Sequence, residues 1–378
     1  MIQQNLTVSQ STLQLEGAFQ AGQLNLSSGD SLVHIHSGGS LDLSASISIS
    51  SSESGSPNRI LIEGSESQMS AGSFSLNGNI EISVDTAGTL MSNGITYIGN
   101  GSHSQALVRV EGVGSTFFST STSTGHFSVG RIGQGTVEIL DGAELVTAGI
   151  AYLGETLTGT GHATVSGYGS KWSSSNAVRV GGHNSQSRGN GILEVRDGGE
   201  IVLASGAITL WQTGTLTGGG GLVQANVINH GVVAPGNSPG LLTIDGNFTQ
   251  MATGILEMEL GGTGMGEFDV LRVLGNVNLD GGLSLSLING YTPNEGDVFQ
   301  ILETSGVLTG AFFGLAEGDV VATFGHAMFH VTYQPSTLHP SLQEGVALYV
   351  VIPELSAFSL MAISGILCLV FWGVRKKT

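Results

Sequence analysis

The middle of the chain, from about residue 95 to 205, repeats a short pattern, and this repeat limits the possible folds more than any other feature. Each copy begins with a short apolar strand that ends in glycine. The four repeat glycines, 31, 24 and 27 residues apart, are Gly99, Gly130, Gly154 and Gly181. One copy is too short to bury its own apolar face, so copies at nearly constant spacing predict units that stack on one another.

A turn of two alternating forms follows the second strand of each copy. The first form, Gly112–Ser115, reads Gly-Val-Gly-Ser and returns as Gly-Tyr-Gly-Ser at Gly167–Ser170. The second form is an Asp-Gly pair, at Asp141-Gly142 and Asp197-Gly198. Because Gly, Asn and Asp tolerate the positive φ of tight turns, we expect such pairs at the corners of a coil. The same prediction covers three Asn-Gly pairs: Asn93-Gly94, Asn100-Gly101 and Asn190-Gly191.

The sequence predicts an all-β fold, a right-handed parallel β-helix or β-solenoid. Apolar residues alternate at period two from residue 1 to about residue 90, Gly makes up 60 of the 378 residues, and only 11% are charged. This combination is typical of many short strands joined by tight turns. At about 24 residues per coil and about 4.8 Å between coils, we expect on the order of 14 coils and a rod of about 70 Å. A β-propeller is the alternative, although blades of about 40 residues fit the spacing less well.

Five segments follow from these patterns. We expect N-terminal coils over 1–94, the Gly-rich repeat over 95–205, later coils over 206–290, a C-terminal cap over 291–350 and a tail over 351–378. The cap is needed because an open last coil would expose unpaired strand edges. The first eight residues lack the basic start and apolar core of a secretory signal, so we expect the natural start upstream of Met1.

The tail predicts a single transmembrane helix. The uncharged apolar run Leu355–Val374 has 20 residues, which is enough to cross a hydrocarbon core of about 30 Å. The basic residues Arg375, Lys376 and Lys377 follow it and should remain cytoplasmic, so we expect the body to lie outside the cytoplasm.

The tail resembles the PEP-CTERM sorting signal of Gram-negative bacteria in three parts: the Pro353-Glu354 step, the apolar run, and the basic end Arg375–Lys377. It departs from the pattern at Leu355, where the family usually has a second proline. The resemblance implies processing near Pro353 and Glu354 by the protease exosortase. It also implies a protein of the cell envelope, first tethered to the inner membrane and then released to the cell surface or exterior. A plain single-pass anchor is the alternative.

The repeat resembles that of autotransporter passengers and PEP-CTERM proteins, in its strand-Gly step and in its Gly-x-Gly-Ser turns. The Pro-Gly-Asn-Ser-Pro-Gly run at 235–240 resembles a passenger-associated element. Large passengers of this kind serve mostly as adhesins, stalks or matrix components. The resemblance therefore implies an adhesin-like surface protein.

Charge excludes one class of partner. Residues 1–354 carry 8 Lys and Arg against 29 Asp and Glu, a net charge of 8 − 29 = −21. Phosphate backbones would be repelled by such a body, so we expect no nucleic-acid binding. The single cysteine, Cys368, lies in the apolar run, so the body has no disulfide and no thiolate metal site.

Four patterns resemble chemical sites, and none predicts one. Ser238 matches the Gly-x-Ser-x-Gly pattern of hydrolases, but strands flank it where a helix should follow. The pairs His326 with His330 and His34 with His36 share strand faces without a visible third metal ligand. The Gly-rich stretch 261–269 resembles a Ca²⁺-binding nonapeptide, but such sites need stacked copies.

The sequence therefore predicts an exported cell-surface or extracellular-matrix structural protein, adhesin-like and without catalytic residues, metal or cofactor. The implied partners are an exosortase-type protease, the membrane through Leu355–Val374, and exopolysaccharide or other surface components. The alternatives are a polysaccharide-processing enzyme on a β-helix and a glycan-binding surface module. The enzyme would need paired carboxylates beside a basic residue in a groove, which the one body lysine and scattered arginines make difficult.

Overall fold

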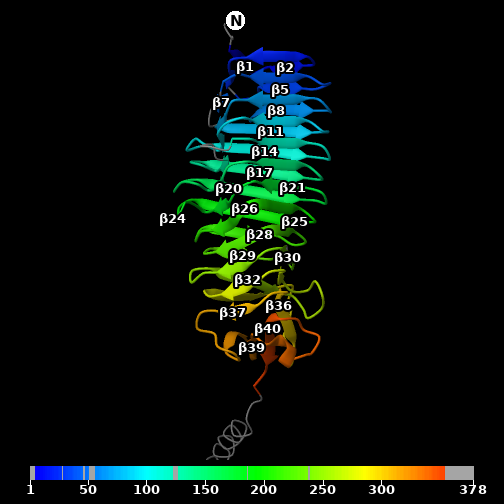
Figure 1. Cartoon of the computed structure of the whole chain (residues 1–378), viewed down its shortest axis with the longest axis vertical. Helices are drawn as coiled ribbons and strands as arrows, with labels where there is room; N and C mark the ends of the chain where they lie inside the picture. The colour runs from blue at the N-terminus through cyan, green and yellow to red at the C-terminus, as the bar shows by residue number, and fades with distance from the viewer. Residues whose placement is uncertain are drawn as a thin grey trace, which may run out of the picture.

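The computed structural model describes residues 5–27, 29–45, 47–50, 56–121, 127–184, 186–236 and 239–353. It is a column of coils stacked along one axis, with the N-terminal coils at one end and a small antiparallel cap at the other (Figure 1). Each coil has three faces, and in every face neighbouring strands come from successive coils.

The first face is a 12-stranded sheet in which all the pairs are parallel. Its strands are β2 (Thr12–Leu15), β5 (Leu32–Ile35), β8 (Asn58–Glu63), β11 (Asn79–Asp85), β14 (Gln105–Glu111), β17 (Gln134–Leu140), β20 (Thr160–Ser166), β25 (Asn190–Arg196), β27 (Gly214–Thr217), β29 (Val232–Ala234), β32 (Ile255–Leu260) and β35 (Gly282–Leu287).

The second face follows the first in each coil, after a tight turn. Its strands are β3 (Ala18–Ala21), β6 (Ser40–Leu43), β9 (Gln68–Ala71), β12 (Thr89–Ser92), β15 (Thr116–Ser119), β18 (Glu144–Thr147), β21 (Lys171–Ser174), β30 (Leu241–Ile244), β33 (Val270–Val273) and β36 (Val298–Thr304).

The third face returns the chain to the next coil. Its strands are β4 (Leu24–Ser27), with β1 (Leu6–Ser9) paired to it, β7 (Ile47–Ser50), β10 (Phe74–Asn77), β13 (Thr96–Ile98), β16 (Phe127–Val129), β19 (Ala151–Leu153), β22 (Val178–Val180), β31 (Phe248–Gln250), β34 (Val277–Leu279) and β37 (Leu308–Gly310). Two long strands, β26 (Glu200–Leu210) and β28 (Leu222–Asn229), run through the second and third faces of their coils.

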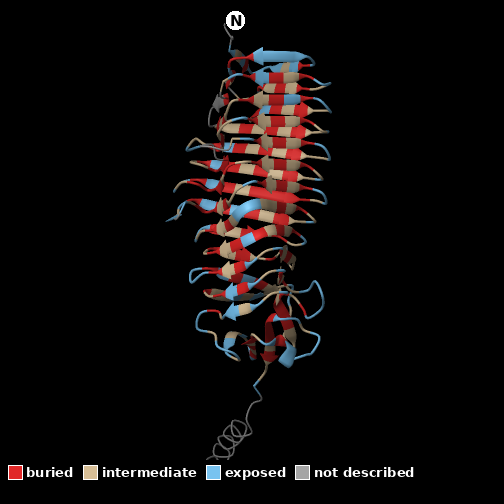
Figure 2. Cartoon of the chain, in the orientation of Figure 1, coloured by how far each residue is buried: buried red, intermediate tan, exposed pale blue. Residues whose placement is uncertain are grey.

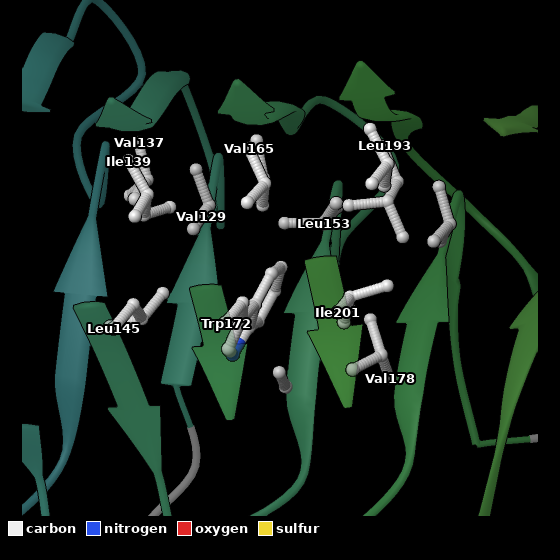
Figure 3. Close-up of a cluster of buried hydrophobic side chains, with 14 of the residues drawn as sticks. Val129, Val137, Ile139, Leu145, Leu153, Val165, Trp172, Val178, Leu193 and Ile201 are labelled. Carbon is white, nitrogen blue, oxygen red and sulfur yellow. The ribbon is translucent and has the colours of Figure 1, made fainter. Parts of the chain in front are cut away.

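The core fills the inside of the coils, because the inward residue of each strand alternates with an outward one (Figure 2). In Figure 3 first-face residues such as Val165 lie across the interior from second-face residues such as Trp172. Trp172 is fully buried, and its indole N–H donates to Thr147 Oγ1 over 3.0 Å. Its ring packs edge-to-face on Phe127 at 6.0 Å between centroids. The interior therefore satisfies the one polar atom of its largest side chain.

The cap is antiparallel, unlike the coils. β36 pairs with β40 (Gly345–Val351), which pairs with β39 (Ala327–Thr332), which pairs with β38 (Val320–Phe324). A 3₁₀ turn at Pro335–Thr337 lies between β39 and β40. The fully buried rings of Phe299 and Phe329 lie 6.0 Å apart inside the cap. The edge of the last coil is therefore covered by paired strands.

The structure confirms an all-β fold of stacked parallel coils and excludes the propeller. The first face has 12 strands within the described residues, which gives about 55 Å of stacked coil. The expected 14 coils were too many, because the residues after β37 fold into the cap. The right-handed sense of the coil stays a prediction.

One predicted corner is wrong. Asn190 and Gly191 lie inside β25, paired with Thr160 and Gly161 of the preceding coil. Gly191 is needed there for a different reason: a Cβ atom would lie 2.4 Å from the Gly181 nitrogen and 2.5 Å from the Leu153 oxygen. Close backbone approach, not a turn, explains this glycine.

The predicted membrane span, Leu355–Val374, lies outside the described residues. Within the part of the chain that the structure describes, none of the helical segments is long and apolar enough to span a bilayer.

Candidate functional site

The four repeat glycines lie at one corner of the rod, where the third face ends and the chain turns toward the next coil. Their φ angles are all positive, from 65° at Gly130 to 83° at Gly99. A Cβ atom on Gly130 would lie 2.0 Å from the Thr160 oxygen of the next coil. The Gly130 N–H donates 2.7 Å to the Ile98 oxygen of the preceding coil. Only glycine combines an easy positive φ with the absence of a Cβ atom, so this corner can turn sharply and direct its loops outward.

The third-face strands and the loops after the repeat glycines carry a set of aromatic and charged side chains, which we name the side ladder: Tyr97, Arg131, Tyr152, Glu155, Arg179 and His183. The ladder arises from strand register, since Tyr97, Ser128, Tyr152 and Arg179 pair in sequence across β13, β16, β19 and β22. Outward positions of successive third-face strands therefore bring these side chains onto one edge.

The first half of the side ladder is an alternation of ring, cation and carboxylate. The Arg131 guanidinium lies 4.5 Å from the centroid of the Tyr97 ring, and its Nη1 donates to Asn100 Oδ1 over 3.0 Å. Its Nε lies 3.5 Å from Glu155 Oε2. Glu155 is buried, so the arginine offsets a charge that would otherwise be costly to desolvate.

The second half centres on Tyr152. Its ring stacks on His183 with centroids 5.0 Å apart, and Arg179 lies 5.6 Å from the ring centroid. Burial raises the pKa of the Tyr152 phenol, with the nearby arginine acting in the opposite direction. His183 Nε2 lies 3.8 Å from Glu155 Oε1, which joins the two halves. The ladder is thus a continuous contact chain across four coils.

A hairpin projects from the rod beside the ladder. It consists of β23 (Gly182–His183) and β24 (Gln186–Ser187), which pair antiparallel, and Asn184 in its turn has a φ of 51°. Trp211 of the next coil lies against it, because a Cβ atom on Gly182 would be 2.5 Å from Trp211 Cδ1. The indole in turn stacks on His230 at 5.0 Å, and burial lowers the pKa of that histidine.

Tyr152 and Glu155 are buried, whereas Tyr97, Arg131, Arg179 and His183 are half-buried. Chemically, the ladder therefore offers partly exposed rings and guanidinium donors on one outer edge, which suits recognition of a ligand surface. Among the described residues there is no group of three or more His, Cys, Asp or Glu side chains that could hold a metal ion. The ladder is therefore our candidate functional site.

The two histidine pairs are not brought together as metal sites within the described residues. His34 Nε2 lies 2.8 Å from Glu63 Oε2, and its ring lies 4.4 Å from that of His36. His330 bonds the Gly318 oxygen through Nδ1 over 2.8 Å and stacks on Tyr349, whereas His326 is exposed in the turn before β39.

The Gly-rich stretch 261–269 is a loop whose last residue has a structural part. The Asp269 side chain is buried and accepts N–H bonds from Gly240 at 2.7 Å and Glu259 at 2.9 Å. Burial raises the pKa of Asp269 to about 6, although the two bonds act in the other direction. The carboxylate lines a cavity of about 450 Å³ on the outside of the first face, together with Glu257. Through its two hydrogen bonds, the Asp269 carboxylate connects the loop before β30 to strand β32.

Several predicted site residues lie outside the described residues. These are Ser238 and the sorting residues Glu354, Arg375, Lys376 and Lys377. Pro353 is the last described residue; it is exposed and follows the end of β40 at Val351.

The comparisons with known proteins give one local match. No model of a known protein family matches the chain. A segment of 118 residues, 30% of the chain, is 32% identical to the adhesin BmaC autotransporter of Brucella suis biovar 1. The match covers 3% of that adhesin's length. The chain is thus similar over part of its length to an autotransporter adhesin, which agrees with the coarse expectation of a surface protein.

Sequence reasoning missed the side ladder, although a signal for it was present. Tyr97, Tyr152 and Arg179 each stand two residues before a repeat glycine. Side chains alternate between the two faces of a strand, so residues at the same distance from the corner glycine point to the same side in every coil. These three side chains therefore form one row along the rod. The hairpin had no comparable signal, since its two-residue strands carry no periodic pattern.

Proposed function

We propose that this chain is an exported cell-surface or extracellular-matrix protein whose β-solenoid acts as an adhesin-like rod. The observation that carries the proposal is the side ladder, a row of ring and guanidinium groups on one outer edge of the rod. A rod of stacked coils holds such a row at a fixed spacing, which suits contact with an extended surface or polymer. The local similarity to an autotransporter adhesin supports the same function.

Delivery through the tail is part of the proposal. Pro353-Glu354, the apolar run Leu355–Val374 and the basic end resemble a PEP-CTERM signal, with exosortase as the processing partner. The protein would first be tethered to the inner membrane of a Gram-negative cell, with its body outside the cytoplasm. Cleavage near Glu354 would release the body to the surface or the matrix, where exopolysaccharide is a natural partner.

We propose a binding role without catalysis. The side ladder contains one carboxylate, Glu155, and that group is buried between Arg131 and His183. Glycoside cleavage generally needs two carboxyl groups flanking the bond. A screen of the purified protein against neutral and acidic polysaccharides tests this role, and release of new reducing ends would favour the enzyme instead.

The main test is the fate of the protein in a Gram-negative cell that has an exosortase. The full chain is expressed with a tag inserted at Gly296, a turn with open space around it. We expect the tag to be accessible to protease on whole cells, and mass spectrometry to find a mature C-terminus near Pro353. A cytoplasmic protein that retains Arg375–Lys377 would overturn the proposed function. Substitution of Pro353 and Glu354 by alanine should leave the tail attached.

A further inference from the structure

We propose that the hairpin β23–β24 and the two arginines beside it, Arg179 and Arg188, bind an acidic polysaccharide through its uronate carboxylates. The inference deepens the proposed function and rests on it, because such a polymer meets the rod only outside the cell. It comes from the distribution of charge, the unused donors of these arginines, and the position of the hairpin.

Arg179 and Arg188 differ from four of the other six cations of the described body. Arg109, Arg131 and Arg272 each have a carboxylate oxygen within 4 Å, and Arg196 has two. Within the described residues Arg179 and Arg188 contact amide and hydroxyl groups instead. In a body with a net charge of −21, two such cations beside one hairpin form a local positive site.

Two further cations, Arg59 and Lys171, form no ion pair with another described residue but have acidic neighbours in register. Arg59 pairs with Glu81 on the first face, and Lys171 lies between Glu144 and Glu200 on the second. The neighbours of Arg179 in register are Tyr152 and Thr209, neither of which is acidic. The charge of Arg179 is therefore less compensated by its surroundings than that of Arg59 or Lys171.

The donors of Arg179 leave one edge of the guanidinium available. Its Nη1 donates to Asn184 Oδ1 at 2.5 Å and to Tyr152 Oη at 3.3 Å. These two bonds use Nη1 and fix the orientation of the group. The Nε–H and the Nη2 hydrogens have no partner in the described structure. They form the edge of the guanidinium that can donate two parallel hydrogen bonds to a carboxylate. A guanidinium that is oriented in advance loses less entropy on binding.

Arg188 supplies the second contact from the end of the hairpin. It is exposed, its Nη2 donates to Gln186 Oε1 over 3.1 Å, and its backbone N–H donates to the Gly181 oxygen over 3.0 Å. Its backbone is therefore fixed to the rod. Trp211 under Gly182 holds the other strand of the hairpin. Arg188 thus stands at the end of a supported hairpin and Arg179 on the strand β22 beside it, where an extended polymer can reach both.

The carboxylate of the side ladder, Glu155, does not cancel this positive site. Glu155 is buried and already lies beside Arg131 and His183. More distant carboxylates are screened at physiological salt, where the Debye length is about 8 Å. A uronate polymer carries one carboxylate per acidic sugar and so meets less repulsion from the body than the dense phosphates of nucleic acid. The chemistry therefore favours an acidic polysaccharide.

The test measures binding of the full chain, held in an uncharged detergent, to alginate as the polyuronate probe at 0.15 M salt. Dextran is the neutral probe and duplex DNA the phosphate probe. The variant is R179Q/R188Q. The matched control is R59Q/K171Q, which removes the same charge from the other two faces. Circular dichroism and thermal melting establish that each variant is folded.

We expect wild type to bind alginate and not dextran, and R179Q/R188Q to bind it about a hundredfold more weakly, at about tenfold per arginine. The control should stay within about twofold of wild type. No binding of alginate by wild type, equal loss in the control, or equally tight binding of DNA would each overturn the inference. The surface location is measured separately, so a surface-exposed protein that ignores alginate refutes only this inference, whereas a cytoplasmic protein refutes the proposed function.

Discussion

A Cβ atom placed on Gly142 would lie 2.8 Å from Cγ2 of Val113 in the preceding coil. Two coils later, Gly198 lies against Tyr168 in the same way, with a Cβ position 3.4 Å from the tyrosine Cα. Val113 and Tyr168 are 82% and 93% exposed, so each covers the glycine of the next coil and not the core. The two alternating turn forms of the sequence are therefore complementary: one carries a side chain, and the other leaves room for it.

The first prediction tests this contact. Gly142→Ala combines a φ of 91° with the clash on Val113 and should lower the free energy of unfolding by about 2 kcal/mol. Val113→Ala removes the clashing atom, so V113A/G142A should recover about half of that loss, and urea denaturation measures both. If the double variant is no more stable than G142A, the contact is not the cause.

The second prediction concerns the repeat glycine Gly154. Its Cβ would lie 2.1 Å from the Asn190 oxygen, which is backbone and cannot move without separating two coils. We expect Gly154→Ala to cost at least about 3 kcal/mol or to prevent folding. Gly296→Ala is the matched control, since its φ of 83° is similar but no atom lies within 4 Å; it should cost about 1 kcal/mol. Similar losses in both variants would show that φ strain alone explains the glycine.

The third prediction concerns the hydrogen bond from Trp172 to Thr147. Thr147→Val leaves a buried indole N–H without this acceptor and should cost about 1–3 kcal/mol. Trp172→Phe should cost about 2–3 kcal/mol through lost volume. The double variant should lose less than the sum, because no donor is left unpaired. Thermal unfolding of the four proteins gives the coupling, and strict additivity would contradict it.

The fourth prediction is a pH dependence from Asp269. Its folded pKa is raised from 3.8 to about 6 by burial, so between these values the folded state binds more protons than the unfolded state. The stability that this group contributes is therefore present below about pH 4 and is lost as the pH rises through 6. Relative to D269N, wild type should lose about 2–3 kcal/mol between pH 4 and pH 7.5.

The control for this pH profile is Asp245→Asn, at an exposed aspartate directly after the last residue of β30, Ile244, in the same region of the rod. It should follow the wild-type curve. Parallel curves for wild type and D269N would show that the Asp269 carboxyl titrates at its ordinary value.

Much of the rod could be predicted from local sequence. Coil spacing followed from the intervals between Gly99 and Gly181, because a stacked coil must bring the chain back after a nearly fixed length. Corners such as Asp141-Gly142 followed from positive φ. Gly191 shows the limit of this reasoning, since the same dipeptide serves in a strand where two backbones meet closely. Local sequence does not distinguish a turn from such an approach.

Long-range pairing was not predictable. The order β36-β40-β39-β38 depends on contacts between segments that meet only in the folded cap. The side ladder depends on register, because Arg131 meets Tyr97 and Glu155 only when three coils are stacked. Spacing alone gives the row of outward positions, but not which loop side chains close the contacts between them.

The corner of the repeat glycines has an evolutionary consequence. Each glycine fixes where the chain leaves one coil, and the strand that begins the next coil fixes where it returns, so the loop between them can differ in length from coil to coil. A hairpin fits between Gly181 and Asn190, whereas a plain turn suffices between Gly130 and Gln134. Insertions there add little closure entropy and disturb no inward side chain. Descendants of such a chain can therefore acquire new surface specificities along this edge by changing loop length, while the stacked scaffold is inherited intact.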